Sequence, residues 1–555
     1  MSMSIKTENK KCQNCKQDFT ISEEEFSLYK KVGVELPTLC FFCRIKLHLS
    51  FWVFGKFRKG VSDLSGESLI TVMPANARYP IYKAKEWWSD AWDPMKFAVD
   101  YDENRPFFDQ LKELQEKIPR PHQQGTNSTN CDWCDDAWDS KNCYLSRAML
   151  KCENLSYCYR VVEVKDSYDV ALSYNLQNSY DCVSCHDSFN LNFSETSKDC
   201  IDSYFLFDCR NCQNCFMSWN LRNKQYCIRN KQYTKEEYEN EIKKIKLDSY
   251  KKVELLKAEF ENIIKKEAVH RENFNLKTTN SVGNYMTNCD QCVNVFTWDN
   301  SQNCRNSLRG IDTKDCIDQL GTWHDEVSGA NSCVYGGYGI KNSAWSNASY
   351  SEYLDLCDEV EYCFGCVGIR KKKYCILNKQ YTKEDYKKLK DKIIGDMEKR
   401  GEYGKYLPYS MGLCDYYLSN GRIYFPDVSK EDIIKKGGYW SDEDLSSRDG
   451  VSSTTLPDSI IDTGKSICSQ ALICPETKYR FNISEAEYEF HKNKNFALPR
   501  LHFDLRALKR AAKTVVLKSY SSKCFYCKAD IMAYYPPEWE YNKIACEDCY
   551  KQNIA

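Results

Sequence analysis

Two charged segments of the chain carry the apolar spacing of amphipathic helices. In residues 234–273 a broken apolar stripe runs through a sequence rich in Lys and Glu, which predicts a helix that packs one face on a core. The stripe consists of Ile242, Ile245, Leu255, Phe260 and Ile264. Thr234, with Glu237 three residues later, provides a capping box at the start of this helix. Residues 382–401 repeat the pattern in a shorter form, and Gly401 is a natural C-cap.

The segments before these helices consist of short aromatic and polar phrases. Residues 129–233 and 287–381 end in NLRNKQYCIRNKQYTKEEY and GIRKKKYCILNKQYTKEDY, which align at an offset of 148 residues. Inside each segment, phrases such as QNSYDC (177–182) recur about every eleven or twelve residues. Two phrases would make a coil of about 22 residues in a parallel β-solenoid, with Asn and Asp at its turns. The middle of the chain is therefore predicted to hold two copies of a β-solenoid.

Each end of the chain contains two C-x-x-C pairs. The first four cysteines are Cys12, Cys15, Cys40 and Cys43, and the last four are Cys524, Cys527, Cys546 and Cys549. Zinc takes four thiolates in a tetrahedron, and a C-x-x-C turn lets two of them hold one ion. Four cysteines leave no open position for catalysis, and a redox C-x-x-C would need a single reactive pair on a βαβ unit. Two structural zinc ions are therefore predicted.

The two ends also align with each other, without gaps, at an offset of 462 residues. Residues 12–44 match residues 474–506, and both segments contain a capping box. At this offset the first quartet falls on Cys474, Thr477, His502 and Leu505, and the last quartet falls on Ser62, Ser65, Ala84 and Trp87. The pattern predicts a duplicated unit with two tandem zinc sites, of which each copy has kept a different one. Metal binding by the degenerate pair Cys474 and His502 stays open.

The first quartet stands in a longer motif, C-x-x-C-x-x-x-F…E-x-x-F…Y…G…P-x-x-C-x-x-C-R. Its positions are Cys12, Cys15, Phe19, Glu23, Phe26, Tyr29, Gly33, Pro37, Cys40, Cys43 and Arg44. Over these residues the chain resembles the bacterial "probable zinc-ribbon/treble-clef" domain family, which implies a zinc-binding fold and no particular activity. The whole chain is similar to cysteine-rich, zinc-binding repeat proteins of bacteria with reduced genomes. That similarity rests on the NKQYTKEEY-type phrases and on the terminal ribbon from Pro537 to Tyr550, and it implies architecture only.

Charge and cysteine content narrow the alternatives. The net charge of -1 gives no global basic field, so nucleic-acid binding would need local patches. The sequence lacks an apolar stretch of membrane-spanning length and an N-terminal signal core, so we expect a cytoplasmic protein without membrane insertion. In a reducing compartment the 21 cysteines from Cys131 to Cys375 become small buried residues or additional metal ligands. Candidates for additional ligands are Cys131, Cys134, Cys143, Cys209, Cys212, Cys215, Cys363 and Cys366.

These patterns together predict a multidomain α+β/β protein. Duplicated zinc-ribbon/treble-clef modules at both ends would flank two cysteine-rich β-solenoid-like segments, each followed by a helix. The expected domains are 1–60 (zinc ribbon or treble clef), 61–125 (degenerate ribbon and Trp-rich linker), 126–233 (first solenoid), 234–286 (charged helix), 287–381 (second solenoid), 382–404 (helix), 405–470 (connector), 471–520 (degenerate copy) and 521–555 (C-terminal zinc ribbon).

Basic stretches follow the ribbon units, and they suggest a function. We expect a non-enzymatic zinc-binding protein that binds RNA or a ribonucleoprotein, with aromatic side chains such as Phe51 and Phe54 available for base stacking. The expected phosphate-binding residues are Arg44, Lys46, Lys56, Arg58, Arg506, Lys509, Arg510 and Lys513. A solvated basic face is the simpler interpretation of these cations. The alternative functions are a protein-interaction scaffold with solenoid docking surfaces and, third, a β-helix carbohydrate-active enzyme. The sequence leaves the oligomeric state open.

Overall fold

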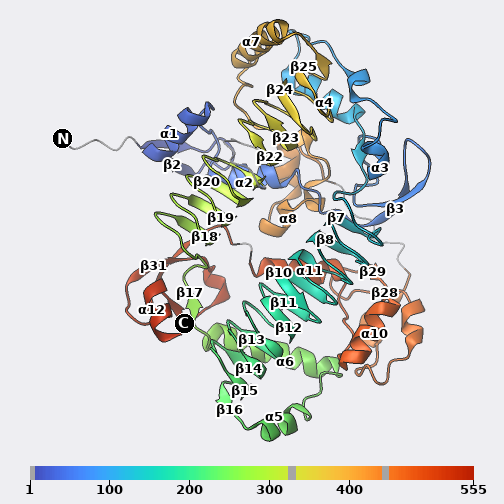
Figure 1. Cartoon of the computed structure of the whole chain (residues 1–555), viewed down its shortest axis with the longest axis vertical. Coiled ribbons are helices and arrows are strands. Elements are labelled where there is room, and N and C mark those ends of the chain that lie inside the picture. The colour runs from blue at the N-terminus through green and yellow to red at the C-terminus, as the bar shows by residue number, and fades with distance from the viewer. Residues whose placement is uncertain (1–6, 323–332, 441–448, 515, 555) are drawn as a thin grey trace, which may run out of the picture. The chain divides into compact units, whose positions relative to one another are not determined.

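The chain folds into two compact units that interleave along the sequence. The computed structural model describes residues 7–322, 333–440, 449–514 and 516–554. Unit 1 comprises residues 1–122 and 273–441, and unit 2 comprises residues 123–272 and 442–555. The N-terminal cysteine quartet therefore belongs to the same unit as the second cysteine-rich segment, and the C-terminal quartet belongs with the first. Figure 1 shows this by colour, since the blue helix α2 (Phe41–Leu49) lies beside yellow-green strands.

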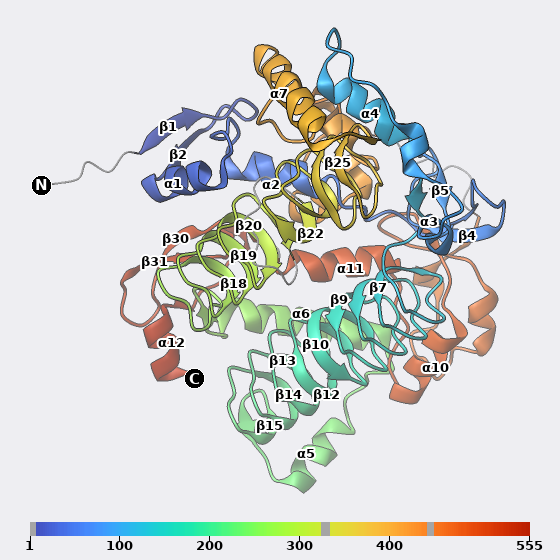
Figure 2. The ribbon, with the colours of Figure 1, turned by 45° about the horizontal axis from the view of Figure 1, so that its top comes forward.

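Unit 2 is built around a sheet whose strands follow one another in sequence order. Its strands are β7 (Cys134–Trp138), β8 (Ser146–Leu150), β9 (Tyr159–Val162), β10 (Tyr168–Gln177), β11 (Tyr180–Val183), β12 (His186–Asn192), β13 (Ile201–Phe207), β14 (Gln213–Trp219), β15 (Gln225–Ile228) and β16 (Lys231–Gln232). From β7 to β15 the pairing is parallel, with Cys134 opposite Ser146 and Cys215 opposite Cys227. Figure 2 shows the resulting stack of strands, which we call the ladder of unit 2.

One turn of the chain around this ladder takes 12 residues, because paired residues are 12 positions apart. The predicted coil of about 22 residues is wrong. A phrase that recurs every eleven or twelve residues marks a whole turn and not half of one. The coil is so short because every third residue from Asp136 to Arg229 adopts the left-handed conformation, with φ between 45° and 60°. Asn and Asp hold many of these positions, since their short polar side chains tolerate this conformation best among residues with a Cβ.

The side chains at these left-handed positions also bond from one turn to the next. The Asn130 amide donates to Asn142 Oδ1 at 2.9 Å, and Asn142 donates to Asn154 at 3.1 Å. Asn154 in turn donates to the Asp166 carboxylate at 2.7 Å. The predicted placement of Asn and Asp at turns is thus correct for this column, although the turns come every three residues.

The interior of the ladder explains the cysteine content. From Cys134 to Ser218 every third residue is buried, and each is Cys, Ser, Ala, Val, Leu or Met. The Ser140 hydroxyl donates to the Trp138 carbonyl at 2.8 Å and accepts the Cys152 N–H at 3.1 Å. The Cys152 thiol donates to the Leu150 carbonyl at 3.3 Å. Small side chains that satisfy nearby backbone groups therefore fill a core too narrow for larger ones.

Unit 1 contains a second ladder of the same kind. Its strands are β18 (Val282–Thr287), β19 (Val293–Asp299), β20 (Arg305–Ile311), β21 (Leu320–Thr322), β22 (Cys333–Tyr338), β23 (Ala344–Ser349), β24 (Val360–Phe364), β25 (Lys373–Ile376) and β26 (Lys379–Gln380). Val293 pairs with Arg305 and Cys363 with Cys375, again 12 residues apart. Twenty of the 21 cysteines between 131 and 375 are buried and free, as expected of small core residues; the side chain of Cys333 lies outside the described set.

The repeated NKQYT phrase closes the carboxyl end of each ladder. In unit 2 the Asn230 side chain accepts the Trp219 N–H at 3.0 Å and donates to the Trp219 carbonyl at 2.9 Å. In unit 1 Asn378 makes the same two bonds to Val367, both at 2.8 Å. The next residues form the antiparallel strands β16 and β26, which cover the last turn. An exposed parallel edge, a site for unwanted strand pairing, is thereby blocked.

Helices cover one side of each ladder. The segment expected as one long helix consists of α5 (Lys235–Ile242), α6 (Tyr250–Lys266) and the short strand β17 (His270–Arg271). In α6, Phe260 packs against Phe205 of the unit 2 ladder with ring centroids 5.6 Å apart. In unit 1, α7 (Lys383–Lys399) follows the ladder, and Phe107 of α4 (Phe107–Lys117) packs on Phe364 at 5.2 Å.

Residues 405–440, expected to be part of a connector, instead belong to the core of unit 1. Tyr406, Leu407, Met411, Leu413 and Tyr416 are buried there. The short helices α8 (Gly421–Tyr424) and α9 (Lys430–Lys435) follow them. The apolar side chains are spread between polar and proline residues without a regular period. The hydrophobic pattern of this segment therefore does not predict that it is packed in a core.

Candidate metal centres

The N-terminal quartet is held by a β-hairpin and the start of a helix. Strands β1 (Glu8–Lys11) and β2 (Asp18–Ile21) flank a turn that carries Cys12 and Cys15, and Cys40 is the N-cap of α2. The four Sγ atoms lie within 4.8 Å of one another. The Cys40 N–H donates to Cys12 Sγ at 3.3 Å. Cys12, Cys40 and Cys43 are buried, whereas Cys15 is exposed.

The C-terminal quartet repeats this arrangement in unit 2. Cys524 and Cys527 lie in the turn between β30 (Tyr520–Lys523) and β31 (Asp530–Ala533). Cys546 follows β32 (Ile544–Ala545) and is the N-cap of α12 (Glu547–Asn553). The four Sγ atoms again lie within 4.8 Å of one another, and the Cys546 N–H donates to Cys524 Sγ at 3.4 Å.

In each quartet the surroundings favour the thiolate form of one cysteine, Cys40 at the N-terminal site and Cys524 at the C-terminal site. The hydrogen bond from the Cys43 thiol lowers the pKa of Cys40 to about 5, against the effect of burial. Burial alone would raise the pKa of Cys524, but the backbone N–H groups of Cys546 and Cys527 bring it down to about 6. The hydrogen bond with Cys546 raises the pKa of Cys549 to about 12. One thiolate at each centre therefore forms near neutral pH, and a bound cation would displace the remaining protons.

The same backbone turn occurs at four places. In each, an N–H donates to the carbonyl oxygen of the residue five positions later, at 2.8–2.9 Å. The residue just before this acceptor has φ between 60° and 72°. The donor and acceptor pairs are Cys12 and Gln17, Ser62 and Glu67, Cys474 and Tyr479, and Cys524 and Ala529. Farther along the chain from these turns, a helix begins at nearly the same aligned position in α2 and α11 (Phe503–Ala512), and likewise in α3 (Ala84–Trp87) and α12. These are the positions paired by the 462-residue alignment.

The two turns without a quartet use other side chains at the metal positions. The Ser62 hydroxyl donates to the carboxylate of Glu86 in α3. His502 is the N-cap of α11, and its Nδ1 accepts the Asp504 N–H at 3.1 Å. Within the described residues, the two quartets are the groups in which three or more candidate ligands gather within 4.8 Å. Neither the pair Cys474 and His502 nor the candidate ladder cysteines form such a group there.

The predicted phosphate-binding arginines are mostly buried. Arg44, Arg506 and Arg510 are 2%, 9% and 6% exposed, and each is paired with a carboxylate of its own unit. Burial and internal pairing argue against the nucleic-acid role expected for these three arginines, which stays a prediction. Phe51 and Phe54 are buried as well, so their rings cannot stack on bases.

The other five predicted cations all make contacts within the protein. Lys46 lies 5.0 Å from the centroid of the Phe425 ring, and Arg58 donates to the Met73 and Pro74 carbonyls. Lys509 pairs with Glu476 at 2.7 Å, and Lys513 pairs with Glu195. Lys56 also has an interaction partner. The pairs of Lys509 and Lys513 fit the simpler interpretation of the basic stretches, namely cations that balance acidic neighbours.

In unit 1 the residue after the last cysteine of the N-terminal quartet connects the candidate metal centre to the ladder. Arg44 Nε donates to Asp318 Oδ1 at 2.7 Å, and the Arg44 and Asp318 side chains are 3% and 1% exposed. The hydroxyls of Tyr29 and Tyr406 donate to the other Asp318 oxygen at 2.6 and 3.2 Å. Asp318 is a left-handed residue of the ladder, with φ 54°.

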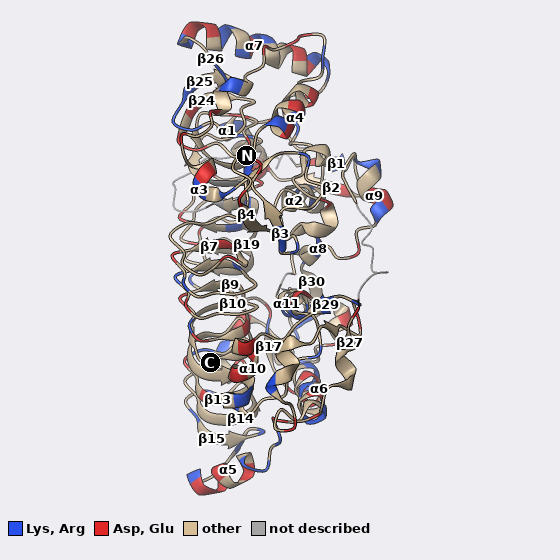
Figure 3. Ribbon diagram, turned by 90° about the vertical axis from the view of Figure 1, so that its right-hand side faces the viewer, with Lys and Arg blue, Asp and Glu red and all other residues tan. Residues whose placement is uncertain are grey.

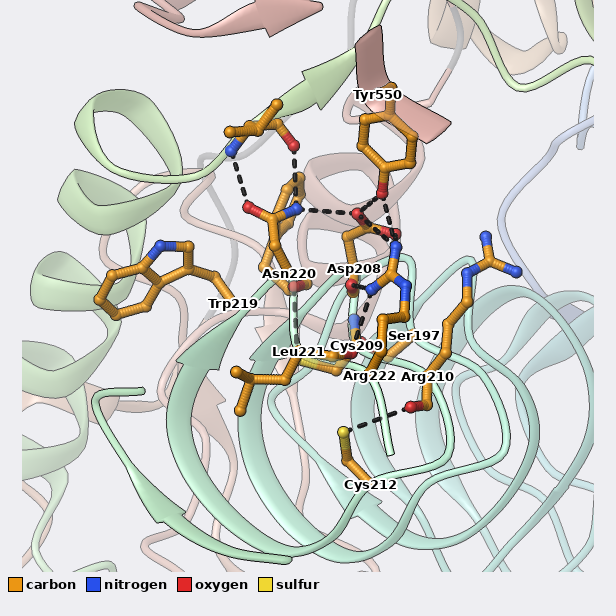
Figure 4. Close-up of polar contacts among 12 residues, drawn as sticks. Ser197, Asp208, Cys209, Arg210, Cys212, Trp219, Asn220, Leu221, Arg222 and Tyr550 are labelled. Atoms are coloured by element: carbon orange, nitrogen blue, oxygen red, sulfur yellow. Dashed lines mark hydrogen bonds and ion pairs between the residues drawn. The ribbon is translucent and has the colours of Figure 1, made fainter. Parts of the chain in front are cut away.

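Unit 2 has the corresponding connection after Cys549. The Tyr550 hydroxyl donates to the carboxylate of Asp208, a left-handed ladder residue with φ 48°. Asn220 donates to the same carboxylate at 2.8 Å, and Arg222 pairs with it at 3.3 Å. Figure 4 shows Asp208 between Asn220, Arg222 and Tyr550. A second ladder aspartate, Asp169, pairs with Arg506 and Arg510 of α11.

Sequence reasoning missed these ladder aspartates. Asp169, Asp208 and Asp318 occupy the same left-handed positions as many other Asn and Asp residues, so nothing local distinguishes them. The arginine of the terminal C-x-x-C-R motif was visible, but its partner lies 274 residues away in the sequence.

The buried side chain of His270, near the C-terminal quartet, makes the stability of the folded protein depend on pH. Its strand β17 pairs with β32, its ring stacks on Tyr541 at 3.8 Å, and Nε2 bonds the Ile264 carbonyl at 2.7 Å. Burial lowers the pKa of His270 from 6.5 to about 4. Between these values the unfolded state binds a proton that the folded state does not, so the free energy of unfolding falls as the pH is lowered.

We expect His270→Gln to flatten the stability profile between pH 6.5 and 4 by about 1 kcal/mol per pH unit. The measurement is chemical denaturation of the zinc-loaded protein at several pH values, with the unaltered protein in parallel. At pH 8 neither state of the histidine is charged, so the difference between the two proteins should be constant above pH 7. An unchanged slope below pH 6.5 would contradict the assignment.

Comparisons with known proteins do not assign a family to this chain. No family model matches the sequence, and no curated protein matches it. One solved structure, described as a "putative acetyltransferase" from Desulfovibrio desulfuricans G20, aligns over 44% of this chain and 63% of its own length. The identity is 11% and the TM-score is 0.09, so this likeness carries no argument. In the part of the chain that the structure describes, no helix is both long and apolar enough to cross a membrane.

Proposed function

We propose that this protein is a non-enzymatic zinc-binding protein in which two structural zinc ions fix the terminal segments of the chain onto two β-ladders. The observation that carries the proposal is the convergence of four thiol sulfurs within 4.8 Å at each end of the chain. Four thiolates suit zinc, which prefers tetrahedral sulfur coordination, and they leave no position for substrate. The metal would thus stabilise the fold, as it does in small zinc-dependent units.

The wider role that we propose is a scaffold for protein interactions. Each unit supports an extended ladder, and ladder residues such as Tyr174, Phe189 and Ile201 are 42%, 42% and 41% exposed. Phe189 and Ile201 lie opposite each other on neighbouring strands and so form a contiguous exposed apolar patch, which is typical of contact surfaces. The internal ion pairs of the predicted phosphate-binding arginines make an RNA partner the weaker alternative. The free ladder thiols suit a reducing compartment such as the cytoplasm. Descent of the four turn-and-helix units from one duplicated, zinc-ribbon-like ancestor is part of the same proposal.

Metal analysis tests the zinc assignment directly. Protein expressed and purified without added metal should contain two zinc ions per chain, because each quartet closes one tetrahedral shell. Elemental analysis by mass spectrometry, combined with a protein concentration from amino-acid analysis, gives this ratio. Iron in place of zinc would reject the structural-zinc proposal. A ratio of four or more would assign metal to the ladder cysteines as well.

A further inference from the structure

A row of tyrosines runs along one edge of the unit 1 ladder. Tyr338, Tyr350, Tyr362 and Tyr374 follow at intervals of one ladder turn, with successive ring centroids 5.3, 5.1 and 5.5 Å apart. The last two of these contacts are parallel stacks, with interplanar angles of 9° and 10°. Tyr338 and Tyr350 are 50% and 47% exposed. The row is therefore a pre-ordered amphipathic surface, of the kind that is enriched at protein interfaces.

Next to this row, acidic side chains lie on one turn of the ladder and basic side chains lie on the following turn. Asp358, Glu359 and Glu361 lie on one turn, and Arg370, Lys371 and Lys373 lie on the next. Lys371 pairs with Glu359 at 3.9 Å and Lys373 pairs with Glu361, all in register one turn apart. The Lys371 and Lys373 side chains are 75% and 63% exposed. Figure 3 marks acidic and basic residues in red and blue, with β24 and β25 labelled.

We propose that this face, defined by the tyrosine row with Glu359, Glu361, Lys371 and Lys373, pairs with the same face of a second copy. In a two-fold arrangement the ladders would run antiparallel, so the acidic turn of one copy would face the basic turn of the other. Glu359 and Glu361 of each copy would then meet Lys371 and Lys373 of its partner, and Tyr362 of each copy would lie beside Tyr374 of its partner. The pattern is self-complementary, which is the requirement for an isologous contact.

The same pattern argues against a polyanion as the occupant. A nucleic acid needs a continuous positive surface, whereas here a turn with three acids lies directly beside the basic turn. The two turns of each copy that meet in this arrangement span about 10 Å at the strand spacing of about 4.8 Å. So short a contact is smaller than most specific interfaces, so the dimer should be weak and should depend on concentration and salt.

Charge reversal in the full-length, zinc-loaded protein tests the proposal. Variant A carries Lys371→Glu and Lys373→Glu, which makes both turns acidic. Variant B carries Glu359→Lys and Glu361→Lys, which makes both turns basic. The altered side chains of variant A are well exposed, so it should fold normally, and circular dichroism and zinc content check this for both variants. Sedimentation equilibrium over a wide concentration range measures association of each protein alone and of A mixed with B.

The unaltered protein is expected to form a dimer, and each variant alone should dimerise at least about tenfold more weakly because like charges then face each other. The mixture of A and B should form a heterodimer as tight as the original homodimer or tighter. A protein that stays monomeric at every concentration would overturn the proposal. Dimerisation that is unchanged in A and B would overturn it too, since another surface would then be responsible.

Discussion

Cys12→Ser should reduce the zinc content from two ions to one per chain and unfold the N-terminal hairpin. Cys12 is buried, and its sulfur accepts the Cys40 N–H, so it joins the turn to α2 even without metal. Structural zinc contributes on the order of 10 kcal/mol or more to the folding of small units at neutral pH. Three thiolates and a hydroxyl would bind zinc far more weakly. Hydrogen exchange followed by mass spectrometry should show loss of protection over residues 8–50, with residues 520–553 unchanged.

The chain supplies a matched control for this variant. Cys474 stands at the same place in the same backbone turn, with an N–H bond of 2.9 Å to the residue five positions later, as in Cys12. It is also fully buried. Because it has no quartet around it in the described structure, Cys474→Ser should leave the zinc content at two ions. Equal zinc loss in both variants would mean that Cys474 is also a ligand, and retention of both ions in Cys12→Ser would reject the N-terminal centre.

The metal centres could be predicted from the sequence because their determinants are local. Cys12 and Cys15 lie in one turn, and Cys40 and Cys43 lie at the start of one helix, so spacing alone specifies most of the geometry. The capping boxes were predictable for the same reason, and both Ser22 with Glu25 and Thr234 with Glu237 form them. The box predicted at Ser484 forms only in part: its hydroxyl accepts the Glu487 N–H, but the Glu487 carboxylate bonds Tyr157 and Arg506 instead.

The ladders were predicted in kind but not in pitch. Inner positions alternate among chemically different small residues, such as Ser173, Cys185, Ser197 and Cys209 at successive turns. Serine counts as polar in a hydrophobic pattern, so the sequence does not show the three-residue period of the inner positions. The left-handed positions also include Leu145, where a positive φ is rare and cannot be expected from the side chain.

The interleaving of the two units lies beyond any local pattern. The N-terminal centre belongs to the same unit as the ladder that begins after residue 272, although the other ladder follows it directly in sequence. Long-range contacts such as Arg44 with Asp318 decide this pairing, and their two partners look ordinary when each is taken alone. An arginine beside a zinc cysteine suggests nucleic acid by composition, whereas burial assigns it to the core.

Asp318→Ala should destabilise unit 1 by about 3–5 kcal/mol, the usual cost of removing one member of a buried ion pair. The change leaves the Arg44 guanidinium, 2% exposed, without a counter-charge. It also removes the acceptor of the Tyr29 and Tyr406 hydroxyls. Chemical denaturation, monitored by hydrogen exchange, would show the loss of unfolding free energy in unit 1. Both zinc ions should be retained in the native state, because none of their ligands is altered.

An exposed pair of the same unit provides the comparison. Lys392 and Glu103 form an ion pair whose side chains are 53% and 55% exposed. Water screens such charges and competes for them, so Glu103→Ala should cost less than about 1 kcal/mol. A loss of several kcal/mol in this variant would mean that charge removal alone explains the effect at Asp318.

The double variant Arg44→Met and Asp318→Leu distinguishes two contributions to the free energy of unfolding: the destabilisation by an unpaired buried charge and the stabilisation by the intact ion pair. If part of the loss in Asp318→Ala comes from a stranded guanidinium, removal of both charges should recover that part, since apolar side chains tolerate the same dry site. The Tyr29 and Tyr406 hydroxyls lack their acceptor in both variants, so their share of the loss should stay. A double variant as unstable as the sum of the two single variants would contradict this and assign the cost to lost packing. Recovery would identify the aspartate as the partner that makes an arginine acceptable between a zinc centre and a ladder. The position after the last zinc-site cysteine then acts as the attachment point of the terminal module, a role that Tyr550 fills on Asp208 in unit 2 with a neutral hydroxyl.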